Sequence, residues 1–511
     1  MYRDLHQTQQ QSAATRISPQ ASQRVLQSRA LRGSTVLHLA TAAGLASILA
    51  LAGCGNQYRP VVSAINPVGP AGQPTKYAVA VSSPSTTTAG LATFVDFSGD
   101  TVLSTPSILA NPNYFALNNG GNEGFVINAS GSLNDFATSN PTALITSEIV
   151  QTTLPASSAP VSISAITPYN GTSSIFVPQT ATSSIAVLST ATSSLLQQLT
   201  VAANPVYVVG ADNTPRVYAI SQGAGGNGSV AAIEATSTSS LSISTTIPVG
   251  ASPVYGVMTS DDRRAYIMNK GSGTVSVLNV VNNALDATTP TITLPTISYP
   301  AGSNAGVAYA AGTSAPNPVW ADISTTSDQL VVLNQGDGVH PGSLSIIGIP
   351  LCSSITQPSN PLCSSTNPTD ATGFGTITNT VNVGVNPVMV SVLQDGTAAY
   401  VVNAGIKAGV NAAYPNGVEG SISVVSLVNG VVTATIPALS TAAATPTTAS
   451  SAGYVFGHPN SVSATVGTPT GKVYVTSGDS QYLSILYTNT NTIQEHVNLQ
   501  GLGLRVLVTS P

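Results

Sequence analysis

The sequence predicts an all-β fold, and three observations support that prediction. Charged residues make up only 6% of the 511 residues, against about 25% in an ordinary globular protein. Hydrophobic residues make up 42% and the mean hydropathy is positive, whereas disordered chains combine low hydrophobicity with high charge. Short alternating strands separated by Gly, Ser and Asn turns recur through most of the chain, which indicates a repeat architecture.

The first 54 residues are typical of an export signal, because five arginines precede the apolar run 35–53 and a cysteine follows it directly. This apolar run is short for a transmembrane helix and is interrupted by polar residues and glycines. Its end, "LAGC" at 51–54, resembles the lipobox of bacterial lipoproteins. That resemblance implies cleavage before Cys54 and lipid attachment to its sulfur; a plain secretory signal with a chance cysteine is the alternative. We expect a signal peptide at 1–53, a tether at 54–76 and one domain at 77–511.

The charge and cysteine content of the mature chain narrow the function classes. Nine Lys and Arg residues stand against eighteen Asp and Glu residues after position 53, so the chain lacks the clustered basic surface that binds nucleic acid. Cys352 and Cys363 lie eleven apart in a Pro/Ser-rich segment. In an oxidising compartment they are expected to form a disulfide that closes a loop, with two free thiols as the alternative.

The repeated unit is a module of four short strands. The first strand opens with proline, which is tolerated there because its missing N–H breaks no interior ladder bond. The second strand is of the kind "RAYIMN" at 264–269, and the third of the kind "TVSVLN" at 274–279. Modules follow one another at intervals of 45 to 72 residues, and their opening dipeptides are Asn111-Pro112, Ala159-Pro160, Asn204-Pro205, Ser252-Pro253, Asn317-Pro318, Asn386-Pro387 and His458-Pro459.

Four short strands about every 45 residues are typical of a β-propeller, in which each four-stranded sheet, or blade, buries both faces against its neighbours. Buried faces also account for the low charge. The stretch 250–285, "GASPVYGVMTSDDRRAYIMNKGSGTVSVLNVVNNAL", resembles one repeat of the YVTN family of β-propellers. The similarity covers most of the mature chain and implies the fold far more firmly than an activity, since similar repeats occur in propeller lactonases.

A closed ring needs strands from both ends of the chain, because an open ring would expose sheet edges. "LGLRVLVTSP" at 502–511 has the pattern of a first strand with no blade after it, while 76–108 has the pattern of later strands without a first one. Joining them predicts a composite blade, so eight blades are preferred over seven. The segment "RPVVSAINP" at 59–67 could instead be a first strand itself.

Long connections between strands are the candidate binding elements, since loops on a rigid scaffold often carry function. Three insertions, 297–316, 404–418 and 438–457, should emerge on one face, and the cysteine loop 351–375 on the other. The alternative is that these insertions are surface loops that the fold tolerates and that bind no ligand. The aromatic and polar residues predicted for this binding face are Tyr299, Tyr309, Asp337, His340, Tyr414, Tyr454, Phe456 and His458.

The mature chain has few candidate catalytic residues. Its histidines are His340, His458 and His496, whereas acid–base or metal chemistry usually needs a cluster of histidines or carboxylates. Asp337 and His340 could ligate a metal together with residues from elsewhere in the chain. The favoured interpretation is that they belong to a solvent-exposed turn without a metal. Trp320 lies on a first strand, where core packing is favoured over a carbohydrate platform. We therefore predict no catalytic residues, no metal site and no cofactor.

These features favour a lipid-anchored extracytoplasmic propeller that acts as a binding or interaction scaffold for a protein or glycan ligand. Gly55 follows the cysteine in place of the aspartate that retains some lipoproteins at the inner membrane, so an outer-membrane location is preferred. The alternatives are a lactonase-like hydrolase, suggested by repeat similarity alone, and a structural component of the cell envelope or surface layer.

Overall fold

The structure is a computed structural model. It describes residues 76–509 apart from 140, 142–148, 168–172, 212–213, 215, 238–239, 325–327, 351–372, 440–452 and 466–470. No helix in this part of the chain is long and apolar enough to cross a membrane. Cys54, Cys352 and Cys363 lie outside the described residues, as does the segment 59–67.

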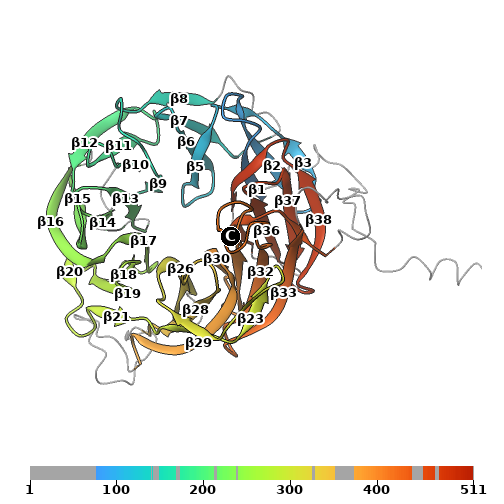
Figure 1. Cartoon of the computed structure of the whole chain (residues 1–511). Coiled ribbons are helices and arrows are strands. Elements are labelled where there is room, and N and C mark those ends of the chain that lie inside the picture. The colour runs from blue at the N-terminus through green and yellow to red at the C-terminus, as the bar shows by residue number, and fades with distance from the viewer. Residues whose placement is uncertain are drawn as a thin grey trace, which may run out of the picture. The chain divides into compact units, whose positions relative to one another are not determined.

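The predicted propeller is confirmed: eight sheets of four or five strands surround a central channel, each ordered from the channel outwards (Figure 1). Blade 1 contains β39 (Leu502–Val508), β1 (Tyr77–Ser83), β2 (Gly90–Asp96), β3 (Val102–Ser104) and β4 (Ser107–Ile108); blade 2, β5 (Pro112–Leu117), β6 (Glu123–Asn128), β7 (Ser132–Ala137) and β8 (Val150–Thr153); blade 3, β9 (Ser164–Ile166), β10 (Ser174–Gln179), β11 (Ser184–Ser189) and β12 (Leu195–Thr200); blade 4, β13 (Pro205–Val209), β14 (Arg216–Ser221), β15 (Asn227–Ser237) and β16 (Ser240–Ala251).

The second half of the ring follows the same plan. Blade 5 contains β17 (Pro253–Met258), β18 (Arg264–Asn269), β19 (Thr274–Asn279), β20 (Ala284–Leu285) and β21 (Thr291–Thr293); blade 6, β26 (Pro318–Ser324), β27 (Gln329–Asn334), β28 (Pro341–Gly348) and β29 (Thr376–Val385); blade 7, β30 (Pro387–Val392), β31 (Ala398–Asn403), β32 (Ser421–Ser426), β33 (Val431–Leu439) and β34 (Val455–Phe456); blade 8, β35 (Pro459–Ala464), β36 (Lys472–Ser477), β37 (Tyr482–Tyr487) and β38 (Thr492–Asn498). Between blades 5 and 6, β22 (Ile297–Tyr299) pairs with β25 (Gly312–Ser314), and β23 (Gly302–Asn304) with β24 (Val307–Tyr309).

The opening prolines have a consistent backbone geometry. The residue before six of the seven prolines is left-handed, with φ between 48° and 54°, a region that Asn tolerates better than most residues. At three of these positions the asparagine Nδ2 donates to a carbonyl nineteen residues later, as Asn386 does to Gly405 O at 2.9 Å. A β-bulge then follows the proline in six inner strands. A β-bulge changes the direction in which nearby side chains point. Here it turns the side chain of the residue two positions after each proline.

Asparagine at the end of the second strand ties that strand to the third. Nδ2 of Asn403 donates to the hydroxyls of Ser421 and Ser423 at 3.1 and 3.0 Å. Asn269 and Asn334 make the equivalent pairs of hydrogen bonds within blades 5 and 6. A buried amide group needs such partners, so the "YxxN" and "SxS" patterns of the repeat are two halves of one interaction.

Tyrosine in the second strand joins neighbouring blades. Tyr400 of blade 7 donates its hydroxyl to Asn491 Oδ1 of blade 8 at 2.6 Å, and Tyr218 of blade 4 reaches Asn283 Oδ1 of blade 5 at 3.3 Å. Both asparagines are left-handed, in turns between third and fourth strands. The conserved geometry of the turn therefore positions an acceptor for the tyrosine of the preceding blade.

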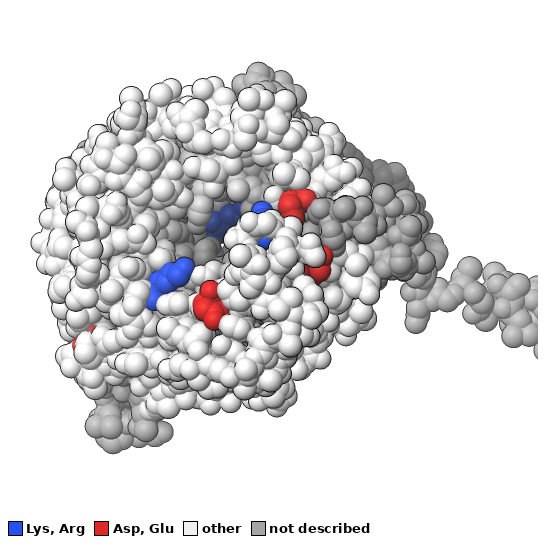
Figure 2. All heavy atoms as spheres, viewed as in Figure 1, with Lys and Arg blue, Asp and Glu red and all other residues white. Residues whose placement is uncertain are grey.

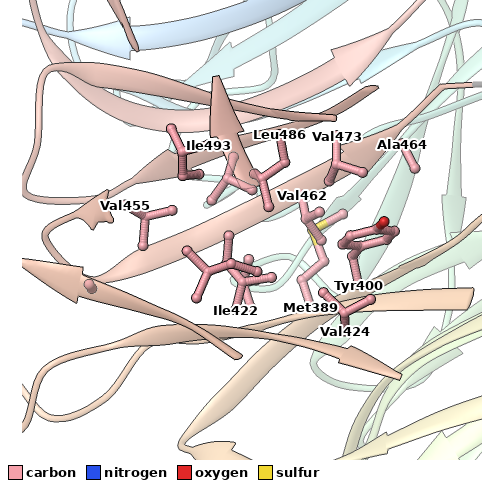
Figure 3. Close-up of a cluster of buried hydrophobic side chains, with 14 residues drawn as sticks. Met389, Tyr400, Ile422, Val424, Val455, Val462, Ala464, Val473, Leu486 and Ile493 are labelled. Carbon is pink, nitrogen blue, oxygen red and sulfur yellow. The ribbon is translucent and has the colours of Figure 1, made fainter. Parts of the chain in front are cut away.

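Apolar side chains fill each junction between neighbouring blades. Eight buried clusters, one per junction, combine residues from the facing sheets. Figure 3 shows the cluster between blades 7 and 8, where Tyr400, Ile422 and Val424 face Val462 and Val473. Since each blade is covered on both faces, its strands carry apolar side chains on both sides and few charged ones.

The predicted composite blade is also confirmed. β39, at the C-terminal end, occupies the channel position of blade 1 and pairs antiparallel with β1 from Ala78↔Val508 to Ser83↔Leu502. Tyr77 and Thr509 add hydrogen bonds at the strand ends, including Tyr77 N to Thr509 Oγ1 at 3.0 Å. Both ends of the described domain thus close the ring together.

Val506 tests this closure, because its side chain is fully buried in the cluster between blades 8 and 1. We expect Val506→Ala to lower the free energy of unfolding by about 2 kcal/mol through lost burial and a residual cavity. Val428→Ala, at a position 76% exposed, should change it by less than about 0.5 kcal/mol. Urea denaturation of both variants measures the difference; equal effects would show that β39 does not carry the closure.

Candidate functional site

The candidate site with the clearest geometry lies in the central channel. Its cavity has a volume of about 560 Å³. On β17 the lining runs from Tyr255 to Met258 and leaves out Pro253, and Ser260 just after the strand also belongs to it. The cavity therefore occupies the half of the channel near the ends of the inner strands. Exposed residues such as Asn119 and Ser260 lie at its rim. Figure 2 shows one face of the ring with a hollow at its centre and basic side chains within it.

Aromatic rings from three successive blades form a row along the inner strands. Tyr207 and Tyr255 lie 4.7 Å apart between ring centroids, and Tyr255 stacks on Trp320 at 3.9 Å with an interplanar angle of 15°. Each of the three follows an opening proline by two residues, at the bulge. Trp320 is half-buried. It packs against the apolar clusters of two blade junctions, as expected for a core residue, and its ring also takes part in the row at the channel.

Arg505 of the closing strand β39 completes this group. Its guanidinium carbon lies 4.3 Å from the ring centroid of Tyr114 and 5.4 Å from that of Trp320, distances typical of cation–π contacts. The pKa of Arg505 is raised: burial lowers it, and Tyr114, Tyr207 and Tyr255 raise it by more. Its Nε atom is buried and has no hydrogen-bond partner within the described residues.

Asp322 is the acidic group on the cavity wall. Its Oδ2 accepts from Val392 N and its Oδ1 from Ile323 N, both at 2.8 Å. Burial raises the pKa of this carboxyl to about 6, although these two hydrogen bonds act in the opposite direction. Burial, with a smaller contribution from Tyr114, raises the pKa of Tyr207 to about 12, so this phenol keeps its proton near neutral pH.

The predicted binding face brings four of its residues together. Tyr299 stacks on His340 at 4.4 Å between centroids, and Tyr309 meets both rings edge-on at 6.0 and 4.9 Å. His340 Nδ1 lies 2.7 Å from Asp337 Oδ2. The nested hairpins β22–β25 and β23–β24 are tied to this loop through Asn304 Nδ2, which donates to a backbone carbonyl of 335–340 at 2.8 Å. The rings mainly contact one another, which makes the cluster an anchor for the hairpins.

His458 lies beside a second cavity of about 370 Å³ on the same face, which Lys407 also lines. Its Nδ1 contacts Asp479 Oδ2 at 2.6 Å and its Nε2 contacts Ile406 O at 3.2 Å. Both partners are acceptors, so the doubly protonated ring fits best; the Asp479 contact raises the pKa of His458 accordingly, against the effect of burial. His458 thereby holds the 404–418 insertion.

The remaining predicted residues contribute less accessible surface. Tyr414 is buried with Ile406 and Val418 in a small cluster inside its own insertion. Phe456 is 1% exposed and packs against Tyr482 and His496. Tyr454 is half-buried beside β34. Groups of three or more metal-ligating side chains do not occur among the described residues.

Comparisons with known proteins support the fold. No protein-family model and no curated protein matches the chain. Among solved structures, dihydro-heme d1 dehydrogenase NirN in complex with DHE matches at 10% identity with a TM-score of 0.51, over 86% of this chain and 77% of that one. Apo AztD from Citrobacter koseri matches at 9% identity with a TM-score of 0.48, over 85% and 97%. A putative 6-phosphogluconolactonase from Bacteroides uniformis matches at 12% identity with a TM-score of 0.43, over 70% and 95%.

The likeness to NirN supports the β-propeller fold alone and says nothing of an activity. The channel group was not predicted from the sequence. Its signal was nonetheless present, because an aromatic residue recurs two positions after the opening proline in Tyr114, Tyr207, Tyr255 and Trp320. Arg505 stands on a strand without that proline, and the pattern alone does not align it.

Asp322 gives a pH-dependent prediction. Because its pKa is raised above the ordinary value near 4 to about 6, the neutral carboxyl stabilises the folded state. That contribution is fully present below about pH 4 and is lost as the pH rises through about 6. Urea denaturation from pH 4 to 8 should therefore show a smaller loss of stability in Asp322→Asn than in the wild type.

Glu495→Gln, an exposed substitution on β38, provides the control and should follow the wild-type profile. A profile for Asp322→Asn that runs parallel to the wild type over this range would contradict the assignment of the titration to the channel carboxyl.

Proposed function

We propose that this protein is a lipid-anchored, extracytoplasmic β-propeller that serves as a binding scaffold and holds a small ligand in its central channel. The observation that carries the proposal is the channel cavity, where Arg505 has no ion-pair partner among the described residues and lies beside a row of aromatic rings. Concave sites that combine apolar surface with polar groups are the usual form of ligand sites.

Binding is favoured over hydrolysis by the chemistry of the lining. The described residues around the cavity include one carboxyl group, that of Asp322, and no histidine. A lactonase-like hydrolase would call for an acid–base grouping near the bound carbonyl. His340 and His458 both belong to the opposite half of the domain, where each is engaged by an aspartate.

The anchor is supported by the resemblance of 51–54 to a lipobox. We expect the full chain, produced in a bacterium, to incorporate labelled palmitate and to fractionate with membranes. Cys54→Ser should abolish both, and Cys352→Ser should abolish neither. A wild-type protein that is secreted in soluble, unlabelled form would contradict the anchor and leave the binding proposal standing.

The binding claim is tested with the mature chain and a fragment library that contains anionic, neutral and cationic compounds. Trp320 is the single tryptophan of the sequence and belongs to the channel row, so its emission reports on this site. Some class of compound is expected to shift that emission saturably, with affinities in the millimolar range or better, as for small fragments. Absence of any saturable shift across the library would overturn the proposal.

A further inference from the structure

The described part of the domain neutralises its other buried cations with carboxylates. Arg264 Nη2 lies 3.0 Å from Asp286 Oδ2, and both side chains are almost fully buried. Lys472 Nζ lies 2.6 Å from Asp100 Oδ1 in a similar setting. A buried charge without a counter-charge destabilises the folded state. In these two pairs a buried carboxylate supplies the counter-charge.

Arg505 departs from this pattern. No carboxylate forms an ion pair with it among the described residues, and it is the one Lys or Arg in the described cavity lining. Tyrosine and tryptophan faces hold its guanidinium plane instead, and its buried Nε–H lacks an acceptor there. A guanidinium held in place in this way matches the planar, two-oxygen geometry of a carboxylate.

Tyr114 adds a second donor to this position. Its ring lies under the Arg505 guanidinium, with 4.3 Å between the guanidinium carbon and the ring centroid, and both residues line the cavity. A phenol carries one O–H that it can donate. Arg505 and Tyr114 therefore offer N–H and O–H groups side by side to one anion.

The rest of the cavity limits the ligand's charge and shape. Its wall presents apolar and polar surface in similar measure; Ala116, Ile163 and Val208 are among the apolar lining residues, and its acidic group is Asp322. Arg505 supplies one counter-charge, which suits a single negative charge on the ligand. Asp322, whose pKa is about 6, is ionised at pH 7.5 and would repel a dianion such as a phosphate monoester more strongly than a monoanion. The volume of about 560 Å³ lies within the range of small-molecule sites.

Resting on the channel-binding function above, we infer that the ligand is a small monocarboxylate with an apolar body. Its carboxylate would lie against the guanidinium of Arg505 and the hydroxyl of Tyr114, next to the Tyr207–Tyr255–Trp320 row. Its apolar body would extend towards the ends of the inner strands, where the cavity opens at Asn119 and Ser260.

The test compares four compounds that share one apolar body: cyclohexanecarboxylate, its carboxamide, cyclohexyl phosphate and cyclohexylamine. Each is titrated against the mature chain at pH 7.5 with Trp320 emission as readout, and isothermal calorimetry provides an independent affinity. Since hydrogen bonds to charged groups are worth about 1.5–3 kcal/mol, the carboxylate should bind at least about tenfold more tightly than the carboxamide. It should also bind more tightly than the phosphate and the amine.

Variants identify the groups responsible. Arg505→Met should remove the preference for carboxylate over carboxamide, and Arg505→Lys should retain part of it. Tyr114→Phe keeps the ring under the guanidinium and should weaken carboxylate binding several-fold while leaving carboxamide binding unchanged. Arg263→Met, on an exposed hairpin turn, is the matched control and should behave as the wild type. Thermal unfolding checks each fold, and Tyr114→Phe decides the matter if Arg505→Met does not fold.

The outcomes separate this inference from the function on which it rests. If the carboxamide, phosphate or amine binds as tightly as the carboxylate, or if the preference survives in Arg505→Met or Tyr114→Phe, the monocarboxylate assignment is wrong and channel binding stands. If none of the four compounds binds and the charged and neutral fragments also fail, channel binding itself is wrong.

Discussion

The antiparallel pairing of β39 with β1 is the contact on which the rest of the structure depends. It joins residues more than four hundred positions apart in sequence, such as Val79 and Leu507, and it completes the blade that closes the row of sheets into a ring. The pairing also completes the apolar clusters on both sides of blade 1. The strand that closes the ring is the one that brings Arg505 into the channel, so fold closure and the proposed binding charge depend on the same seven residues.

Polar groups inside the ring are arranged within the repeat, which explains how so large a domain needs so little charge. The asparagine that ends the second strand in blades 5, 6 and 7 bonds hydroxyls of the third strand, and Tyr218 and Tyr400 bond the turn of the next blade. Close packing accompanies these bonds: a side chain at Gly250 or Gly384 would collide with the amide of Asn269 or Asn403. Neutral hydrogen bonds therefore replace ion pairs at most buried positions, and the few buried charges stand out.

Much of the fold follows from local pattern. Alternation and turn residues predict the strands, the opening prolines locate the inner strands, and the unmatched strand patterns at 76–108 and 502–511 predict the composite blade. The grouping of Tyr299, Tyr309, Asp337 and His340 follows in part from blade topology, which places their connections on one face. Burial of individual side chains is less predictable, because Phe456 packs under β37 and β38 through contacts that only the folded insertion creates.

The cluster formed by Tyr114, Tyr207, Tyr255, Trp320 and Arg505 in the channel could not be predicted from the sequence, for a physical reason. Its members come from blades 1, 2, 4, 5 and 6, and their proximity arises from ring closure, which no local pattern encodes. A crystal structure of the mature chain with p-bromobenzoate tests the account most directly. We expect anomalous bromine density towards the ends of the inner strands and carboxylate oxygens within about 3 Å of Arg505 nitrogens. Bromobenzoate bound in the channel with its carboxylate turned away from Arg505, or a channel without it under saturating conditions, would contradict the account.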